Sequence, residues 1–126
     1  MSKQEKTMET RELENILKDI THAKIAIVGD FCLDSYWFID ESKSEISIET
    51  SQKTRPVRTQ KYSLGGAGNV ANNLSAMGVG DIYAFGVVGM DPFATEMIKI
   101  MKNAGIRTEY LLTQETDWST HVYAKP

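Results

Sequence analysis

Two short apolar segments rich in β-branched residues most constrain what this chain can fold into. They are KIAIVGD (24–30), which ends in Gly-Asp, and DIYAFGVVG (81–89), which ends in Gly. A nearly continuous apolar run of this length is typical of a strand buried on both faces of a parallel sheet. The two segments lie about 50 residues apart, which leaves room for the crossover connection that parallel strands need.

Helical patterns alternate with these segments. Residues 68–78 carry apolar side chains at helical spacing and are closed by glycine, while residues 91–105 have Asp at the N-cap, Pro at the first helical position and a closing Gly. Residues 106–112 again indicate a strand, and residues 119–126 begin a further extended segment. This alternation predicts an α/β fold built on a parallel sheet.

A helix is also predicted near the N-terminus, over residues 8–20. Its apolar residues share one helical stripe, and Thr10 is the candidate N-cap. The stripe consists of Leu13, Ile16, Leu17 and Ile20.

Between the two apolar segments, the sequence predicts a small antiparallel excursion. Residues 35–40, 44–50 and 55–62 are aromatic or alternate between apolar and polar side chains, as half-exposed strands do. The aromatic cluster Tyr36, Trp37 and Phe38 has two interpretations that the residues leave open. It packs a small sheet, or it forms a lid that excludes water from a pocket.

Composition narrows the class of protein. The chain has 126 residues and a net charge of −3, so it fits one domain, and it lacks the clustered basic excess of a nucleic-acid-binding surface. Its single cysteine excludes an internal disulfide, and no apolar run approaches the roughly 20 residues of a membrane helix. We expect a soluble cytoplasmic protein that binds neither nucleic acid nor membrane.

The glycine-rich segment YSLGGAGNVANNLSAMG (62–78) does not match the common phosphate-binding loops. A dinucleotide fingerprint follows the first strand directly, and a Walker loop ends in Gly-Lys-Ser/Thr. Two interpretations remain. The segment is a tight turn with Asn69 as helix cap, or Gly65 and Gly66 let the backbone approach a ligand whose hydroxyl Asn69 binds.

The segment GDFCLD (29–34) places two carboxylates after the first strand, where open α/β sheets bind ligands. Asp34 is a candidate acceptor for polyol hydroxyls, whereas Asp30 serves equally well to anchor the turn. No histidine or third carboxylate lies nearby in the sequence, so no metal site is predicted. Cys32 lacks a neighbouring histidine that would activate it and is interpreted as a packed residue.

Three further polar residues receive structural interpretations. Asp91 is interpreted as the N-cap of the helix that follows it, and His22 and His121 are isolated in the sequence.

The motifs IVGDFCLDSYWF, GGAGNVANNLSAMGV and FGVVGMDPFATEMIKIMKNAGI occur in an order that resembles the PfkB, or ribokinase-like, carbohydrate kinases. The resemblance covers residues 24–126 and is greatest to the heptose-7-phosphate kinase branch. It implies the N-terminal half of a three-layer α/β sandwich with a small antiparallel β lid. The implied parts are an N-terminal helix (1–22), core segments (24–34 and 63–126) and lid strands (within 35–62), all in one incomplete domain (1–126).

The resemblance also implies roles for individual residues. Asp34 and Asn69 would bind sugar hydroxyls, and the backbone at Gly65 and Gly66 would close on the sugar. Cys32 stands where ribokinases carry a sugar-contacting asparagine, which argues against ribose. Tyr36, Trp37 and Phe38 would belong to the lid, which in this family often forms a homodimer interface.

A complete kinase of this family needs roughly 250–300 residues. Its Gly-Ala-Gly-Asp motif, which supplies the catalytic base, and its ATP-binding loops do not occur in this sequence. We therefore expect a sugar-binding and lid portion without catalytic residues of its own. ATP and Mg²⁺ are implied for the full-length enzyme, and neither is expected to bind this chain tightly.

Two alternatives compete with this reading. One is a truncated, non-catalytic module for sugar binding or dimerisation. The other is a nucleotide-binding α/β domain, which the sequence VGDFCLD disfavours because it offers no phosphate loop.

Overall fold

The structure is a computed structural model that describes residues 9–126. Residues 1–8, which include the start of the predicted N-terminal helix, lie outside the described part. The elements in chain order are α1 (Thr10–Asp19), η1 (Ile20–His22), β1 (Lys24–Val28), β2 (Phe31–Ile39), η2 (Glu41–Lys43), β3 (Val57–Gly66), α2 (Ala67–Ala76), β4 (Asp81–Gly89), α3 (Pro92–Asn103), β5 (Ile106–Gln114) and β6 (His121–Lys125).

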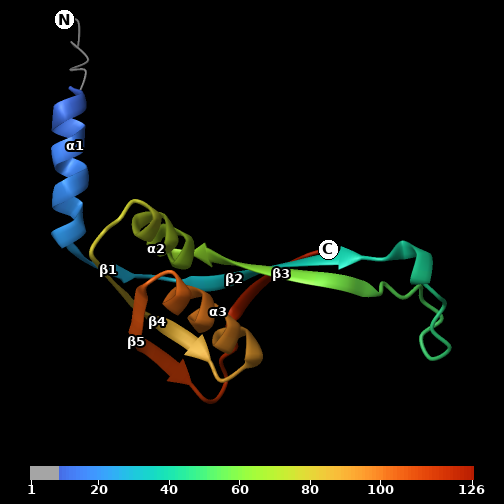
Figure 1. Ribbon diagram of the computed structural model, residues 1–126. Helices are drawn as coiled ribbons and strands as arrows, with labels where there is room; N and C mark the ends of the chain where they lie inside the picture. The colour runs from blue at the N-terminus through green and yellow to red at the C-terminus, as the bar shows by residue number, and fades with distance from the viewer. Residues whose placement is uncertain (1–8) are drawn as a thin grey trace, which may run out of the picture.

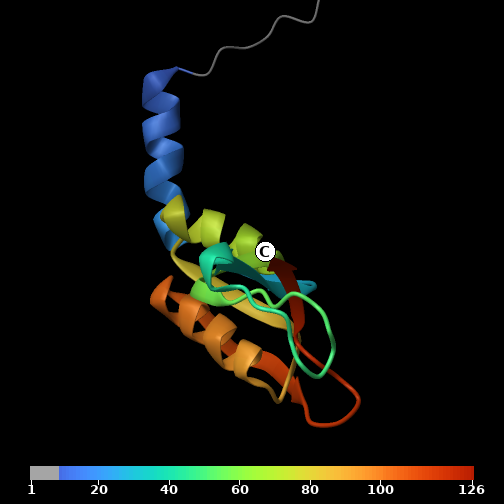
Figure 2. The same cartoon turned by 90° about the vertical axis from the view of Figure 1, so that its right-hand side faces the viewer.

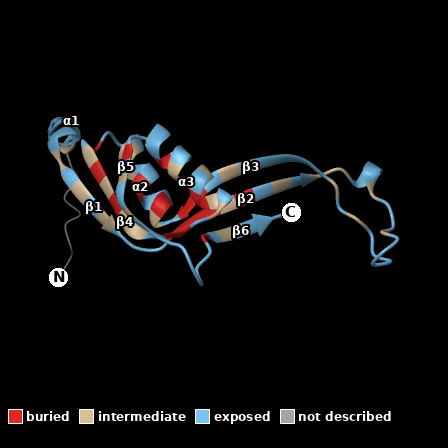
Figure 3. Ribbon diagram, turned by 90° about the horizontal axis from the view of Figure 1, so that it is seen from below, coloured by how far each residue is buried: buried red, intermediate tan, exposed pale blue. Residues whose placement is uncertain are grey.

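A three-stranded parallel sheet, in the order β1-β4-β5, forms the α/β part. Alternate residues of β4, including Ile82 and Ala84, are buried beneath the helices α2 and α3. Met97 and Met101 of α3 are fully buried in the same core. Figure 3 shows the buried residues gathered where α2 and α3 cover the strands. The predicted parallel α/β sheet is confirmed.

A second sheet, in the order β3-β2-β6, extends away from the first (Figure 1). Strand β2 pairs antiparallel with β3 and parallel with β6. Two boundaries differ from the sequence expectation. The expected division between core and lid at residues 34/35 falls inside β2, which is one continuous strand. The last extended segment joins this second sheet, not the parallel core sheet.

The strand predicted over residues 44–50 is wrong. This segment lies at the far tip of the β2–β3 ribbon (Figure 1), where only one isolated bridge forms, between Ile46 and Lys53. Ile48 is 99% exposed. Alternation alone does not make a strand, because a strand also needs a partner to satisfy its backbone groups and a surface on which to bury one face.

Helix α1 forms as predicted but projects away from both sheets (Figures 1 and 2). Its apolar stripe stays largely exposed, with Leu13, Ile16 and Leu17 each 42–45% accessible. The predicted N-cap Thr10 is wrong, because the N-cap is Glu9 and its side chain forms no capping hydrogen bond. Among the described helices, none has the length and apolar character needed to cross a membrane.

Candidate functional site

The glycine-rich segment is a strand that runs directly into a helix. Gly66 ends β3 and is the N-cap of α2, with φ of +54°. A Cβ at this position would lie 2.4 Å from the carbonyl oxygen of Asp30. The same carbonyl accepts a hydrogen bond from the Ala67 N–H at 2.9 Å. Gly66 is therefore required by the backbone of this tight joint between strand and helix.

The structure contradicts the interpretation of Asn69 as a helix cap. Helix α2 begins at Ala67, so Asn69 is its third residue, and the cap position belongs to Gly66. The Asn69 side chain is exposed, and it forms no hydrogen bond with any other residue in the range 9–126. Its amide is free to bind a ligand, as the other interpretation requires.

Gly65 has a different role from its neighbour. It pairs with Cys32 across β2 and β3, and a Cβ there would lie 2.7 Å from Cys32 Sγ and 3.3 Å from Asp34 Oδ1. The missing side chain therefore leaves room for the thiol and the carboxylate, which pack over Gly65.

Strand β2 sorts its side chains onto two faces. Phe31 and Leu33 face the buried core, whereas Cys32, Asp34 and Tyr36 lie on the opposite face because side chains alternate along a strand. This opposite face of the sheet β3-β2-β6, with Asp34 at its centre, is named the Asp34 face below. Side chains of β3 and β6 that pair with these residues in register belong to it as well.

The three aromatic residues predicted as a lid divide between the two faces. Tyr36 and Phe38 alternate with Asp34 on the Asp34 face and are both exposed. Trp37 points to the other side, where its Nε1–H donates a 2.6 Å hydrogen bond to Oγ of the buried Ser35. The packing interpretation therefore describes Trp37, and the lid hypothesis is restricted to Tyr36 and Phe38.

Strand β6 brings a lysine to Asp34 that sequence reasoning missed. Lys125 Nζ lies 2.9 Å from Asp34 Oδ2, donates to the Tyr36 hydroxyl at 3.3 Å, and sits 4.9 Å from the centre of the Tyr36 ring. The hydrogen bonds to Asp34 and Tyr36 raise the pKa of Lys125, so its ammonium is charged. The extended pattern of residues 119–126 is the sequence signal that bears on this contact. It predicts a strand but does not reveal that this strand pairs with β2.

A histidine that looks isolated in the sequence lies beside the other carboxylate. His121 Nδ1 is 3.0 Å from Asp30 Oδ1, and its ring stacks on Trp118 with 5.5 Å between ring centres. His121 also pairs in register with Cys32. No three His, Cys, Asp or Glu side chains within residues 9–126 are arranged to hold a metal ion.

The thiol of Cys32 is buried. Burial, followed by the charges of Asp34 and Asp30, raises its pKa, and the nearby Lys125 lowers it less. The protonated thiol is therefore favoured, and a thiol is a poor nucleophile compared with a thiolate. This environment agrees with the interpretation of Cys32 as a packed residue.

Asp91 fixes the position of the segment that leads into β6. It caps α3 as predicted, since Oδ1 accepts from the Ala94 N–H at 2.9 Å, and Oδ2 accepts from the Thr120 N–H at 2.8 Å. The Thr120 hydroxyl in turn accepts from the Gly89 N–H at 3.0 Å. Asp91 thereby ties the start of α3 to the chain just before His121.

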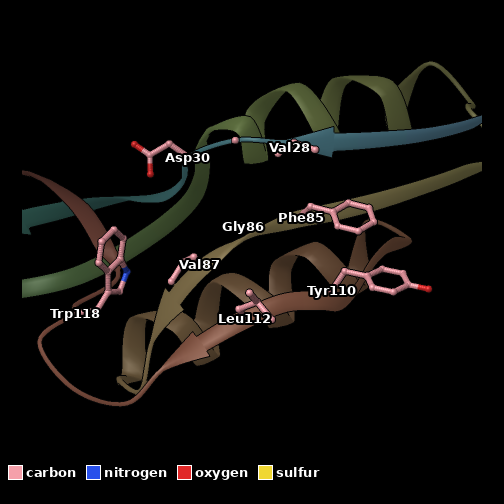
Figure 4. Close-up of a pocket in the computed structure, with 9 residues that line it drawn as sticks. Val28, Asp30, Phe85, Gly86, Val87, Tyr110, Leu112 and Trp118 are labelled. Carbon is pink, nitrogen blue, oxygen red and sulfur yellow. The ribbon is translucent and has the colours of Figure 1, made fainter.

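The uncovered face of the parallel sheet holds a cavity of about 410 Å³. Figure 4 shows Phe85 and Tyr110 side by side in it, and their rings stack with 4.8 Å between centres. The walls are mostly apolar, and Val28 and Leu112 are 81% and 68% exposed. This cavity offers few groups that bind hydroxyls, in contrast to the Asp34 face.

Comparison with known proteins gives consistent matches. A family profile described as "pfkB family carbohydrate kinase" matches residues 22–124. The chain is 40% identical over 93 residues to a bifunctional protein HldE of Methylococcus capsulatus, covering 74% of this chain and 19% of the relative. It is 35% identical over 101 residues to a D-beta-D-heptose 7-phosphate kinase of Bordetella bronchiseptica, covering 80% and 31%. The chain thus spans about a fifth of the length of the first relative and about a third of the second.

Solved structures show the same fold. A putative sugar kinase from Clostridium perfringens has a TM-score of 0.59 at 22% identity, covering 80% of this chain and 29% of that one. A fructokinase from Halothermothrix orenii has a TM-score of 0.54 at 19% identity, covering 81% and 33%. The predicted ribokinase-like α/β fold is therefore confirmed.

Proposed function

The chain belongs to the pfkB family of carbohydrate kinases, and from this premise we propose that it forms the sugar-binding and lid portion of an ATP-dependent kinase. In the full-length enzyme, the γ-phosphoryl group of ATP would pass to a hydroxyl of the bound sugar. The proposed acceptor is a sugar phosphate of the heptose type, because relatives in that branch are 40% and 35% identical to this chain.

The observation that carries the proposal is the Asp34 face. The Asp34 side chain is 20% exposed, and one of its oxygens, Oδ1, lies beside Gly65, where any side chain would crowd it. A carboxylate that is partly shielded from solvent in this way accepts strong, charge-assisted hydrogen bonds from hydroxyls. Asn69 would supply a second polar contact, and Tyr36 and Phe38 would exclude water from the reacting hydroxyl.

The described residues contribute orientation of the acceptor and no catalytic group. Holding a hydroxyl in a fixed position converts a bimolecular step into an effectively unimolecular one. The described residues do not fit Mg·ATP, because β1 is followed directly by β2, not by a glycine-rich loop and helix. The nucleotide and the catalytic base would be held elsewhere in the complete kinase.

Pairing of two copies through the lid remains part of the proposal. The outer edges of β3 and β6 have no partner strand in the described part of the chain, and such edges can pair with a second chain. Cytoplasmic location is also proposed, since the buried free thiol of Cys32 suits a reducing compartment. The alternative, a sugar-binding or dimerisation module without turnover, uses the same surfaces.

Binding measurements with Asp34→Asn test the proposal. Titration calorimetry with heptose 7-phosphate should show affinity reduced by about 10- to 100-fold, because an ionic hydrogen bond is worth roughly 1.5–3 kcal/mol. The control is Asp40→Asn, at an aspartate that caps η2 at the end of the ribbon, and it should bind as the unmodified chain does. Equal affinities for both variants would contradict the assignment of Asp34.

A turnover assay tests whether this chain lacks catalytic groups of its own. The chain alone, incubated with ATP and heptose 7-phosphate, should release no ADP beyond background. Sustained ADP release would show that it carries its own catalytic groups. Equilibrium binding of ATP without sugar would instead favour the nucleotide-binding alternative.

A further inference from the structure

We propose that Lys125 binds the phosphate of the sugar substrate and makes the Asp34 face selective for phosphorylated over neutral sugars. The inference rests on the proposed function of this face, and it assigns a specificity-determining residue within it.

The geometry leaves Lys125 one unused donor. An ammonium group has three N–H donors, and the contacts of Lys125 account for two, to Asp34 Oδ2 at 2.9 Å and to the Tyr36 hydroxyl at 3.3 Å. The side chain is 44% exposed, so the third donor can reach a ligand on the open side of the sheet. Because the other two bonds fix the ammonium, a ligand need not immobilise a free side chain on binding.

The same contacts give the two carboxylate oxygens of Asp34 different surroundings. Oδ2 is held by Lys125, whereas Oδ1 lies beside Gly65, away from the ammonium. A neutral sugar can use Oδ1 alone. A sugar phosphate can donate a hydroxyl to Oδ1 and place a phosphate oxygen against Lys125.

A second lysine lies on the same face. Lys61 pairs in register with Tyr36 from the opposite strand, and it therefore shares the Asp34 face. Its ammonium lies 5.5 Å from the centre of the Phe38 ring. Tyr36 is thus flanked by Lys61 on β3 and Lys125 on β6. The Asp34 face therefore carries two lysines, one on each side of Tyr36.

A purely structural role does not account for the pair. Ion pairs on an exposed surface contribute about 0–1 kcal/mol to stability, and the β2–β6 ladder is already held by its backbone hydrogen bonds. Lys125 also occupies Oδ2 of Asp34, the carboxylate proposed to bind the sugar, and this would hinder the binding of a neutral sugar. It suits a site whose ligand brings an anion of its own.

The test compares heptose 7-phosphate with the same heptose lacking phosphate, by titration calorimetry on the full chain. Lys125→Met should weaken binding of the phosphate by about 10- to 100-fold, in line with the strength of ionic hydrogen bonds. Binding of the neutral heptose should change by no more than about threefold. Lys125→Arg should retain most of the selectivity, and added salt should weaken binding of the phosphate only.

The control is Lys53→Met, at a lysine paired with Glu41 at 2.7 Å at the tip of the ribbon. It should leave both affinities unchanged. If Lys125→Met lowers the affinity for both sugars equally, the lysine only positions Asp34. If it lowers the affinity for neither sugar, Lys125 does not belong to the site. Both results overturn this inference while leaving the proposed function intact, whereas failure of the unmodified chain to bind either sugar contradicts both.

Discussion

Two adjacent glycines at the end of β3 serve different purposes. Gly66 is required by its positive φ and by contact with the backbone at Asp30, whereas Gly65 is required by two side chains, those of Cys32 and Asp34. A backbone atom cannot move out of the way as a side chain can. The two positions should therefore respond differently to the addition of a single methyl group.

Alanine at each glycine tests this difference. Gly66→Ala should lower the free energy of unfolding by about 1–3 kcal/mol or more, because strain at a positive φ adds to a backbone clash. Gly65→Ala should also destabilise the chain, and Cys32→Ala should partly restore it by removing the sulfur that lies 2.7 Å from the added Cβ. Urea denaturation measures the free energy of unfolding of Gly66→Ala, of Gly65→Ala and of Gly65→Ala combined with Cys32→Ala.

Gly78→Ala is the matched control. Gly78 also has a positive φ, of +87°, but no atom lies within 4 Å of the added Cβ. Gly78→Ala should lower the free energy of unfolding by only about 1–2 kcal/mol, through backbone strain alone. If Cys32→Ala gives no rescue at Gly65, the sulfur is not what excludes a side chain there.

At the scale of elements, α1 and α3 show that similar apolar stripes can have different outcomes. Helix α3 buries Ala94, Met97 and Met101 against the sheets and is capped by Asp91. Helix α1 has an equally regular stripe, yet it buries no residue. Periodicity predicts that a helix forms, and only the tertiary structure supplies the surface on which it packs.

The cap of α3 predicts how stability depends on pH. Burial alone would raise the pKa of Asp91, but hydrogen bonds from Thr120 and Ala94 outweigh it and hold the pKa below its ordinary value. The carboxylate therefore stabilises the fold above its unfolded pKa of about 3.9, and this contribution is lost as pH falls through the lower folded value. Thermal melts should show Asp91→Asn losing less stability than the unmodified chain as pH falls from about 5 to 3.

Asp19→Asn, at the end of α1, provides the comparison for this experiment. It should keep the pH dependence of the unmodified chain. If Asp91→Asn has that same steep dependence, another carboxylate governs acid unfolding.

At the scale of the whole molecule, the parallel sheet is covered on one face only within residues 9–126. Helices α2 and α3 pack on that face, while Val28, Phe85, Tyr110 and Leu112 line the open one (Figure 4). Parallel sheets are almost always covered on both faces. An apolar surface of this kind favours association with another polypeptide.

The chain studied alone should therefore self-associate and bind a dye that reports exposed apolar surface. Leu112→Lys on the open face should reduce both effects, because a charge there opposes burial, and it should barely change the unfolding midpoint. Ile48→Lys, at the exposed tip of the ribbon, should reduce neither. Sedimentation and dye fluorescence give the measurements, and a compact monomer that binds no dye would contradict this view.

The sequence by itself determined the elements whose signals are local. The strands β1 and β4, the helix α3 with its cap at Asp91, and the resemblance to the pfkB family all follow from short segments. The strand predicted over 44–50 failed because alternation does not reveal whether a partner strand is present.

Only the tertiary structure decided which residues gather around Asp34. Lys125 reaches this carboxylate because β6 pairs with β2, and His121 reaches Asp30, 91 positions away in the chain, through the same pairing. The position of Trp37 on the buried side, away from Asp34, likewise depends on where β2 meets the core. Strand pairing is made by backbone groups that every residue shares, so a distant partner leaves no trace in the local pattern of side chains.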